Sequence, residues 1–270
     1  LVGSEMCIRD RKRGAHSDRQ TLVCCQQQMD SHPLAVKGTK SENRWSQSRH
    51  EIWSPLPVKQ ITCSVSGAGK SSVIQAAVNA LFDHFDYFAV YSHSHTLDPS
   101  YGDLKDKIRA KYLRTGIDPE LNPVFFDNLE GLPRVLAAQR DRVQEQKDAD
   151  PPVRRLTQLC LVIDDMLHET AHSKVLDNAY ARGRHYGVSV FAGSQLYRGL
   201  SAAIRKNADV LTIHRLTAHE WEAVSEGLAG VYVTKQQLRE VYEMAVGAHP
   251  IRLSYGQAEV QGPVSYTHLR

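Results

Sequence analysis

A short glycine-rich run between a strand-like and a helix-like stretch constrains the fold of this chain more than any other feature. Residues 58–63 (VKQITC) are β-prone and lead directly into 64–71 (SVSGAGKS). Apolar residues then recur at helical spacing, at Val73, Ala77, Ala80 and Leu81. A strand, a glycine turn and a helix in this order form the repeating unit of parallel α/β sheets. The sequence therefore predicts an α/β domain.

The glycine run has the composition of a phosphate-binding loop. Gly67 and Gly69 permit a turn whose consecutive N–H groups converge on one anion. Lys70 is then placed to neutralise the β and γ phosphates of ATP, and the Ser71 hydroxyl to ligate Mg²⁺ at the start of a helix. The pattern's first glycine is Ser64 here, which strains a loop that needs a left-handed residue at that position. The expected nucleotide-binding residues are Ser66, Gly67, Ala68, Gly69, Lys70, Ser71 and Ser72.

A pair of acids follows a second informative stretch. Residues 159–163 (LCLVI) are nearly all apolar, as in a strand covered on both faces, and end in Asp164 and Asp165. Asp164 is placed to hold Mg²⁺ through water, and Asp165 to orient or deprotonate an attacking water. An ordinary turn after a buried strand is the competing interpretation of this pair.

The remaining pattern completes a parallel sheet. Further strands are expected at 87–92, 188–192 and 210–213, with helices between them and a loop at 118–123. The helix before the strand at 188–192 is expected to run through Ala179 and Arg184. A last edge strand at 251–255 is an additional candidate. Two stretches have the form of helix-capping boxes, Thr217 to Glu220 and Thr234 to Gln237.

Charge and the two ends set the expected domain organisation. The net charge is +3. Residues 1–28 hold five basic and three acidic side chains, and Arg270 adds one more basic side chain. The chain between these ends therefore holds 27 basic and 27 acidic residues. LVGSEMCIRDR at the start and VSYTHLR at the end resemble translated sequencing adapters. We expect a non-native leader over 1–28, a polar arm over 29–57, an ATPase domain over 58–262 and a non-native tail over 263–270.

The cysteines and the hydropathy indicate a protein of the cell interior. None of the five cysteines forms a Cys-x-x-Cys pair, and Cys63 and Cys160 fall in expected buried strands. No run of about 18 apolar residues occurs, so neither a membrane span nor a secretion signal is expected.

Four stretches together resemble one family. SGAGKSS, LCLVIDD, GRHYGVSVFAGSQ and AIRKNADVLTIHRL are similar to the FtsK/HerA superfamily, and most similar to the poxvirus-type genome-packaging ATPase with its virophage and Polinton relatives. The resemblance implies a RecA-like P-loop NTPase core with a mostly parallel central sheet flanked by helices. It also implies an ATP-hydrolysing translocase that packages viral or transposon-borne DNA into a capsid, at a virion or a nuclear or cytoplasmic viral assembly site.

The resemblance implies partners and further site residues. In this superfamily a strand ending in a polar sensor lies between the glycine-loop strand and the acidic strand, which makes Gln195 the sensor beside the γ-phosphate. Such motors form homo-oligomeric rings on double-stranded DNA without sequence preference, and they contact capsid proteins. An arginine of one subunit then acts at its neighbour's phosphate. Arg205 and Arg184 are the catalytic candidates, and each is equally readable as a surface residue.

Other residues are candidates for DNA contact, for metal binding or for the core. A basic cluster on one helix is the candidate DNA contact, formed by Lys105, Lys107, Arg109 and Lys111. His93 and His95 with Asp98 have a metal-like spacing, but solvent-exposed histidines are favoured. Aromatic residues at helical spacing, Trp221, Tyr101 and Tyr112, are expected in the core.

Two other functions remain open from the sequence. A small-molecule or nucleotide kinase shares the glycine loop, but Asp165 and Gln195 argue against it. A scaffold that binds ATP without hydrolysis is the non-enzymatic alternative, and the two acids argue against that.

Overall fold

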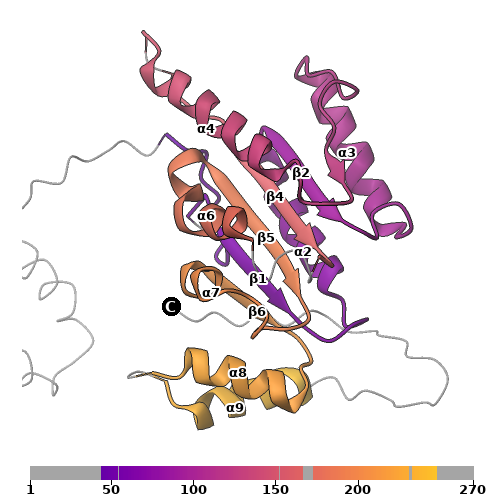
Figure 1. Cartoon of the computed structure of the whole chain (residues 1–270), viewed down its shortest axis with the longest axis vertical. Coiled ribbons are helices and arrows are strands. Elements are labelled where there is room, and N and C mark those ends of the chain that lie inside the picture. The colour runs from indigo at the N-terminus through magenta and orange to yellow at the C-terminus, as the bar shows by residue number, and fades with distance from the viewer. Residues whose placement is uncertain (1–43, 54, 152, 167–172, 231–232, 248–270) are drawn as a thin grey trace, which may run out of the picture. The chain divides into compact units, whose positions relative to one another are not determined.

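The computed structural model describes residues 44–53, 55–151, 153–166, 173–230 and 233–247. Their centre is a six-stranded sheet in the order β3-β2-β4-β5-β1-β6, and every described strand pair is parallel (Figure 1). The strands are β1 Lys59–Cys63, β2 Tyr87–Ser92, β3 Phe125–Phe126, β4 Leu159–Asp164, β5 Val188–Ser194 and β6 Val210–Ile213. This is the parallel α/β architecture that the sequence predicts.

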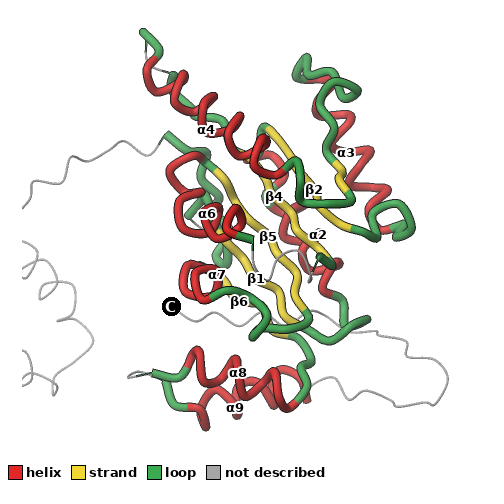
Figure 2. The backbone as a smooth tube through the Cα atoms, in the orientation of Figure 1, coloured by secondary structure: helices red, strands yellow, loops and turns green. Residues whose placement is uncertain are grey.

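Helices connect successive strands (Figure 2). Between the strands lie α2 Lys70–Ala80, α3 Ser100–Arg114, α4 Leu132–Asp148, α6 Lys174–Arg182 and α7 Ala202–Asn207, with short 3₁₀ helices η1 Phe82–His84 and η2 Gly183–Tyr186. Two more helices, α8 Ala218–Leu228 and α9 Lys235–Gly247, follow β6. Parallel strands need such crossovers, because the chain must return to the same edge before the next strand begins.

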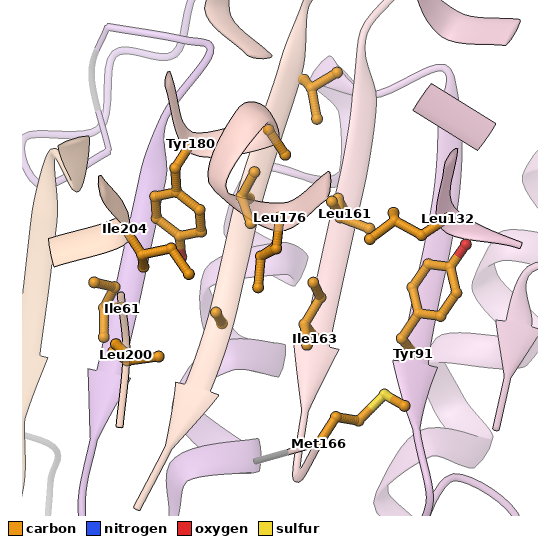
Figure 3. Close-up of a cluster of buried hydrophobic side chains, with 14 of the residues drawn as sticks. Ile61, Tyr91, Leu132, Leu161, Ile163, Met166, Leu176, Tyr180, Leu200 and Ile204 are labelled. Atoms are coloured by element: carbon orange, nitrogen blue, oxygen red, sulfur yellow. The ribbon is translucent and has the colours of Figure 1, made fainter. Parts of the chain in front are cut away.

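The sheet is buried on both faces, and its side chains alternate between two clusters. Leu161 and Ile163 of β4 face a cluster that includes Tyr180 of α6 and Ile204 of α7 (Figure 3). Residues Cys160 and Val162 of the same strand face the opposite cluster, to which α2 and α3 contribute. Successive side chains of a strand point to opposite faces, so a fully buried strand must be apolar throughout. The apolar run at 159–163 has this cause.

The predicted elements agree closely with the observed ones, with two corrections. Strands 87–92 and 210–213 have the expected bounds, but the expected loop before residue 125 leads into an unpredicted two-residue strand, β3. So short a strand carries no periodicity, and it exists because its backbone pairs with Val90 and Tyr91. The edge strand at 251–255 lies outside the described residues, and the domain boundaries remain predictions.

The helix expected through Arg184 ends earlier, at Arg182. The chain tightens into η2 and turns into β5 at Gly187, which has a left-handed φ of 68°. A Cβ atom at this position would lie 2.6 Å from the ring of Trp45 and 2.8 Å from the Thr157 carbonyl oxygen. Close packing against Trp45 and Thr157 therefore requires a glycine at position 187, where η2 ends.

Both predicted capping boxes are present, one of them in full. Thr234 and Gln237 exchange hydrogen bonds, since Gln237 N–H donates to the Thr234 hydroxyl and Thr234 N–H to the Gln237 side chain, at 3.2 and 3.0 Å. Thr217 accepts from Glu220 N–H at 3.3 Å. The Glu220 carboxylate instead accepts from Tyr197 N–H at 2.6 Å, so tertiary contact replaces the second half of this box.

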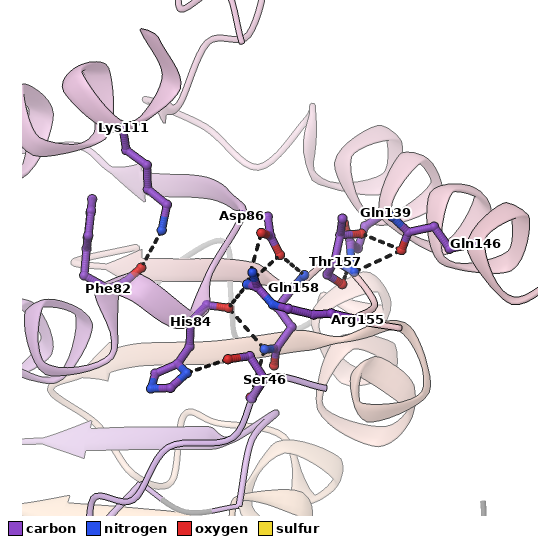
Figure 4. Close-up of polar contacts among 10 residues, drawn as sticks. All are labelled: Ser46, Phe82, His84, Asp86, Lys111, Gln139, Gln146, Arg155, Thr157 and Gln158. Carbon is purple, nitrogen blue, oxygen red and sulfur yellow. Dashed lines mark hydrogen bonds and ion pairs between the residues drawn. The ribbon is translucent and has the colours of Figure 1, made fainter. Parts of the chain in front are cut away.

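A polar network closes the amino-terminal edge of β2 and β4 (Figure 4). Asp86 accepts from Arg155 at 3.1 Å and from Gln158 N–H at 2.8 Å. The Gln158 amide donates to the Ser46 carbonyl oxygen at 3.0 Å, and the Ser46 hydroxyl lies 2.7 Å from Nδ1 of His84. The network thus attaches part of the polar stretch before β1 to the edge opposite the glycine loop.

Candidate nucleotide and metal site

The carboxyl ends of the strands place the glycine loop and the acids at one edge of the sheet. Cys63, the last residue of β1, pairs with Ser194 of β5, and Ser92 of β2 pairs with Asp164 of β4. Strand β5 lies between β1 and β4, as the resemblance implied for the sensor strand. Neighbouring strands lie about 4.8 Å apart, so the glycine-loop strand and the acidic strand are separated by roughly 10 Å. The phosphate-binding loop and the acids therefore flank the end of β5.

The loop has the backbone geometry that its glycines suggested. Gly67 and Gly69 take left-handed φ values of 72° and 87°, and α2 begins immediately afterwards at Lys70. No side chain caps this helix, so its first N–H groups are not used by a capping oxygen. Asp165 is the one non-glycine residue with a positive φ in the described part of the chain, so Ser64 carries no such strain. The departure at the pattern's first glycine is therefore harmless to the loop.

Lys70 is buried at the first position of α2 without an acidic partner among the described residues. A buried ammonium group requires a counter-charge, and a bound phosphate provides one. The charge of Lys70 also affects the pKa values of two nearby groups, His214 and Cys63. Burial lowers the pKa of His214 and Lys70 lowers it further, whereas burial raises the pKa of Cys63 to about 12 and Lys70 opposes that rise.

Asp164 is fully buried and uses its two carboxylate oxygens differently. Oδ2 accepts a hydrogen bond of 2.7 Å from the Tyr101 hydroxyl of α3. Oδ1 is buried and has no hydrogen-bond donor in the described part of the chain. It lies over Gly193 of β5, where an added Cβ atom would come within 2.6 Å of it. The alternation of β4 turns Asp164 to the face covered by α2, the helix that carries Lys70.

These groups fit a magnesium ion bound with phosphates. Mg²⁺ prefers oxygen ligands and uses one or two carboxylates together with substrate phosphates and water. The unpaired Oδ1 of Asp164 and the hydroxyl of Ser71, in the first turn of α2, are groups of this kind. The described residues contain no group of three His, Cys, Asp or Glu that could hold a metal by themselves, and a phosphate-bound magnesium ion needs none.

Asp165 and Gln195 come together beside this carboxylate. Asp165 is exposed, and its φ of 58° turns the chain out of β4. Gln195, directly after β5, donates from Nε2 to Oδ1 of Asp165 at 3.3 Å. Thirty positions separate the two along the chain, and neighbouring parallel strands bring them into contact.

The two candidate arginines lie in different places. The Arg184 guanidinium is 2.9 Å from Oδ1 of Asp209, whose other oxygen accepts from Lys59 N–H at 3.0 Å. Since Lys59 begins β1, Arg184 lies at the amino edge, roughly one strand length of 15 Å from its own glycine loop. Arg205 of α7 lies over the Tyr197 ring, 5.4 Å from its centroid. Arg205 is thus linked to the segment after Gln195, and Arg184 is not.

The basic residues of α3 do not form one solvent-facing cluster, contrary to the sequence-based expectation. Lys111 is buried and donates to the Phe82 carbonyl oxygen at 2.9 Å, and Lys105 donates to the His95 carbonyl oxygen at 2.9 Å. A spacing of two residues turns each side chain about 200° from the previous one on a helix, which separates them. Arg109 remains exposed and lies 3.7 Å from Glu120.

His95 also differs from the expectation, since it is buried rather than solvent-exposed. Its Nε2 lies 2.8 Å from Asp127 Oδ1, and its ring packs 5.5 Å from that of Phe125. The aromatic residues expected in the core are buried, and Trp221 stacks on Tyr242 of α9 at 4.2 Å between ring centroids.

Sequence reasoning missed two residues of the site. Tyr101 was read as core alone, and Gly193 was not singled out. A signal for Tyr101 existed, because a tyrosine buried on an apolar helix face needs a hydrogen-bond partner for its hydroxyl. The sequence signal for Gly193 was weaker. A glycine inside an apolar strand marks a place where another group comes close to the backbone.

The fold and the arrangement at the sheet edge define a class of protein. A parallel sheet with a glycine loop after β1, a lysine and a serine opening α2 and acids ending β4 is the architecture of the P-loop NTPase fold. Among the residues that the structure describes, no helix has the length and apolar character needed to cross a membrane.

Comparison with known proteins gives similarity to solved structures alone. No protein-family model and no curated protein sequence matches the chain. The genome packaging NTPase B204 of Sulfolobus turreted icosahedral virus 2 is similar with a TM-score of 0.45 and 15% identity, over 68% of this chain and 86% of that one. The second and third ATPases of Thermomonospora curvata EccC are similar with a TM-score of 0.40 and 12% identity, over 60% and 31% of the two chains. The cytoplasmic domain of EssC is similar with a TM-score of 0.41 and 10% identity, over 77% of this chain and 38% of that one.

Proposed function

We propose that the chain is a magnesium-dependent ATPase that translocates double-stranded DNA and packages viral or transposon-borne DNA into a capsid. The observation that carries the hydrolytic part is the position of β5. This strand separates the glycine-loop strand from the acidic strand, and it ends in a glutamine that contacts Asp165. A triphosphate on the loop would then have its γ-phosphate near an acid and an amide that share one water.

Different residues of the chain have different roles in ATP hydrolysis. The N–H groups of the loop and Lys70 would bind the β and γ phosphates, and Ser71 and Asp164 would hold Mg²⁺. When bound, Mg²⁺ neutralises and orients the phosphate oxygens. Asp165 accepts the proton of the attacking water, and Gln195 orients that water for in-line attack. Catalysis is thus positioning and electrostatic stabilisation, without a covalent intermediate.

The DNA-packaging part rests on the stretches that resemble the poxvirus-type packaging ATPases of the FtsK/HerA superfamily. The chain between its two ends carries equal numbers of basic and acidic residues, so binding to a duplex needs basic positions repeated around a homo-oligomeric ring. Contacts of this kind are made to phosphates and are therefore independent of DNA sequence and weakened by salt.

Phosphate release with and without long linear duplex DNA tests this proposal. We expect turnover of ATP that DNA stimulates, and Lys70→Ala should lower it about 100-fold or more, because the main counter-charge of the phosphates is lost. Lys235→Ala is the matched control, since it removes an exposed lysine of α9 that is paired with Glu222. Its turnover should equal that of the wild type.

The same assay separates the competing functions. Transfer of phosphate to a small acceptor, independent of DNA, would identify a kinase and overturn the translocase. If wild type and Asp165→Ala bind nucleotide equally and neither releases phosphate, the chain is a nucleotide-dependent scaffold.

A further inference from the structure

The hydrogen bond between Tyr101 and Asp164 joins α3 to the end of β4 in the buried part of the site. Tyr101 has no exposed surface, and its hydroxyl donates to Asp164 Oδ2 at 2.7 Å. The hydrogen bond therefore joins two side chains that are both shielded from water.

Tyr101 is itself held in one position by its neighbours. Its ring meets that of Phe125 edge to face, with centroids 6.2 Å apart. The preceding residue, Ser100, accepts a hydrogen bond of 2.8 Å from Gln75 of α2. The start of α3 is thereby attached to the helix that carries Lys70 and Ser71.

Asp164 is thus restrained on one oxygen and unpaired on the other. Oδ2 is occupied by Tyr101, whereas Oδ1 is buried over Gly193 without a donor in the described residues. A carboxylate that rotates freely would exchange its two oxygens, so neither oxygen would keep a fixed direction. The hydrogen bond to Oδ2 removes this freedom, and the missing Cβ at position 193 leaves space for Oδ1.

We propose that Tyr101 is a positioning residue that fixes the Asp164 carboxylate, so that Oδ1 is the oxygen presented to Mg²⁺ or to a water bound to it. This inference rests on the proposed function, because it assigns the metal-facing group of the same site. In this role Tyr101 acts through Asp164 and is not itself a metal ligand.

Magnesium dependence of nucleotide binding tests the inference without turnover. The thermal midpoint of the protein is followed while MgCl₂ is titrated at a fixed concentration of a non-hydrolysable ATP analogue. We expect Tyr101→Phe to need about 10–100-fold more Mg²⁺ for half of the stabilisation, the range found when a group that orients a metal ligand is lost. The shift given by the analogue in EDTA should be unchanged, because the loop is intact.

Tyr112→Phe is the matched control on the same helix. Tyr112 is also buried, and its hydroxyl accepts from Phe88 N–H at 3.0 Å, within the same cluster but away from Asp164. Its loss should lower the midpoint without nucleotide and leave the magnesium requirement at the wild-type value. A merely structural role of Tyr101 would give the same result for both variants.

Two further variants show whether Tyr101 acts through Asp164. Gly193→Ala presses on Oδ1 from the other side, so it should raise the magnesium requirement by an independent route. In an Asp164→Ala background, Tyr101→Phe should have no additional effect on that requirement.

The outcomes distinguish this inference from the proposed function. If wild type responds to Mg²⁺ and Tyr101→Phe responds identically, the positioning role is wrong and the ATPase proposal stands. If wild type shows no magnesium-dependent nucleotide binding, both are overturned.

Discussion

At the scale of single residues, two adjacent acids occupy opposite environments. Asp164 is the last residue of β4 and points into the buried face beneath α2, whereas Asp165 leaves the sheet with a left-handed backbone and is exposed. The alternation of the strand and this reversal of φ separate their side chains. One carboxylate is consequently buried and the other exposed, as the roles proposed for them at a metal ion and at a water require.

Gly193→Ala should destabilise the protein by about 1–3 kcal/mol, the usual cost of inserting a methyl group into a packed site. The new Cβ would lie 2.6 Å from Asp164 Oδ1 and 3.1 Å from Ile74 Cδ1, so the carboxylate or α2 must move. Urea denaturation measures the change as a lower midpoint with an unchanged slope.

Gly102→Ala provides the control for this prediction. Gly102 is a helical residue of α3, and an added Cβ would meet nothing within 4 Å. Alanine has the higher helix propensity, so this variant should gain about 0.5–1 kcal/mol. A Gly193→Ala variant as stable as wild type would show that the space over β5 is not needed by Asp164.

At the scale of elements, α8 is joined to the segment that follows the sensor strand. The buried Glu220 accepts from Tyr197 N–H at 2.6 Å, and Gly227 packs against the Tyr197 ring, where an added Cβ would lie 3.0 Å from the hydroxyl oxygen. Tyr197 follows Gln195 by two positions. The α8 helix therefore supports the backbone close to Gln195.

Glu220→Ala should cost about 1.5–3 kcal/mol, because it leaves the buried Tyr197 N–H without its charged acceptor. Glu220→Gln keeps an acceptor oxygen and should lose less. The midpoint of urea denaturation measures both. Glu222→Ala is the matched control on the same helix: Glu222 is an exposed partner of Lys235, and its loss should change stability by less than about 1 kcal/mol. Equal losses for Glu220→Ala and Glu222→Ala would contradict this anchoring role.

At the scale of the whole molecule, the positions of Arg184 and Arg205 matter for the proposed ring, in which an arginine acts on the neighbouring subunit. Arg184 lies at the amino edge with Asp209, so it cannot reach the glycine loop of its own subunit. Arg205 contacts Tyr197 and lies next to the segment after β5. An arginine that acts on a neighbouring subunit must complete a site which that neighbour's lysine forms.

Mixing two inactive variants tests this arrangement. Arg205→Ala keeps Lys70, and Lys70→Ala keeps Arg205, so mixed rings contain interfaces with both residues intact. We expect the mixture to recover a part of the DNA-stimulated turnover that neither variant shows alone. Arg184→Ala in place of Arg205→Ala is the comparison, and recovery with that variant alone would assign the role to Arg184. An arginine acting within its own subunit gives no recovery in either mixture.

The sequence alone determined five of the six strands and the position of the glycine loop. The bounds of strands 87–92 and 210–213 and the capping residues of α8 and α9 could be read from it, because hydrophobic period, glycine position and capping are local properties. The placement of the loop and the acids at one edge was predictable for another reason, because the carboxyl ends of parallel strands lie at the same edge of a sheet.

Only the tertiary structure decided which side chains meet. The contact of Tyr101 with Asp164, the space over Gly193 and the capture of Glu220 by Tyr197 join positions far apart in the chain. The burial of Lys111 and the pairing of His95 overturned expectations for the same reason. Periodicity gives the face on which a residue lies, whereas its partner depends on how separate elements pack, and no local pattern carries that information.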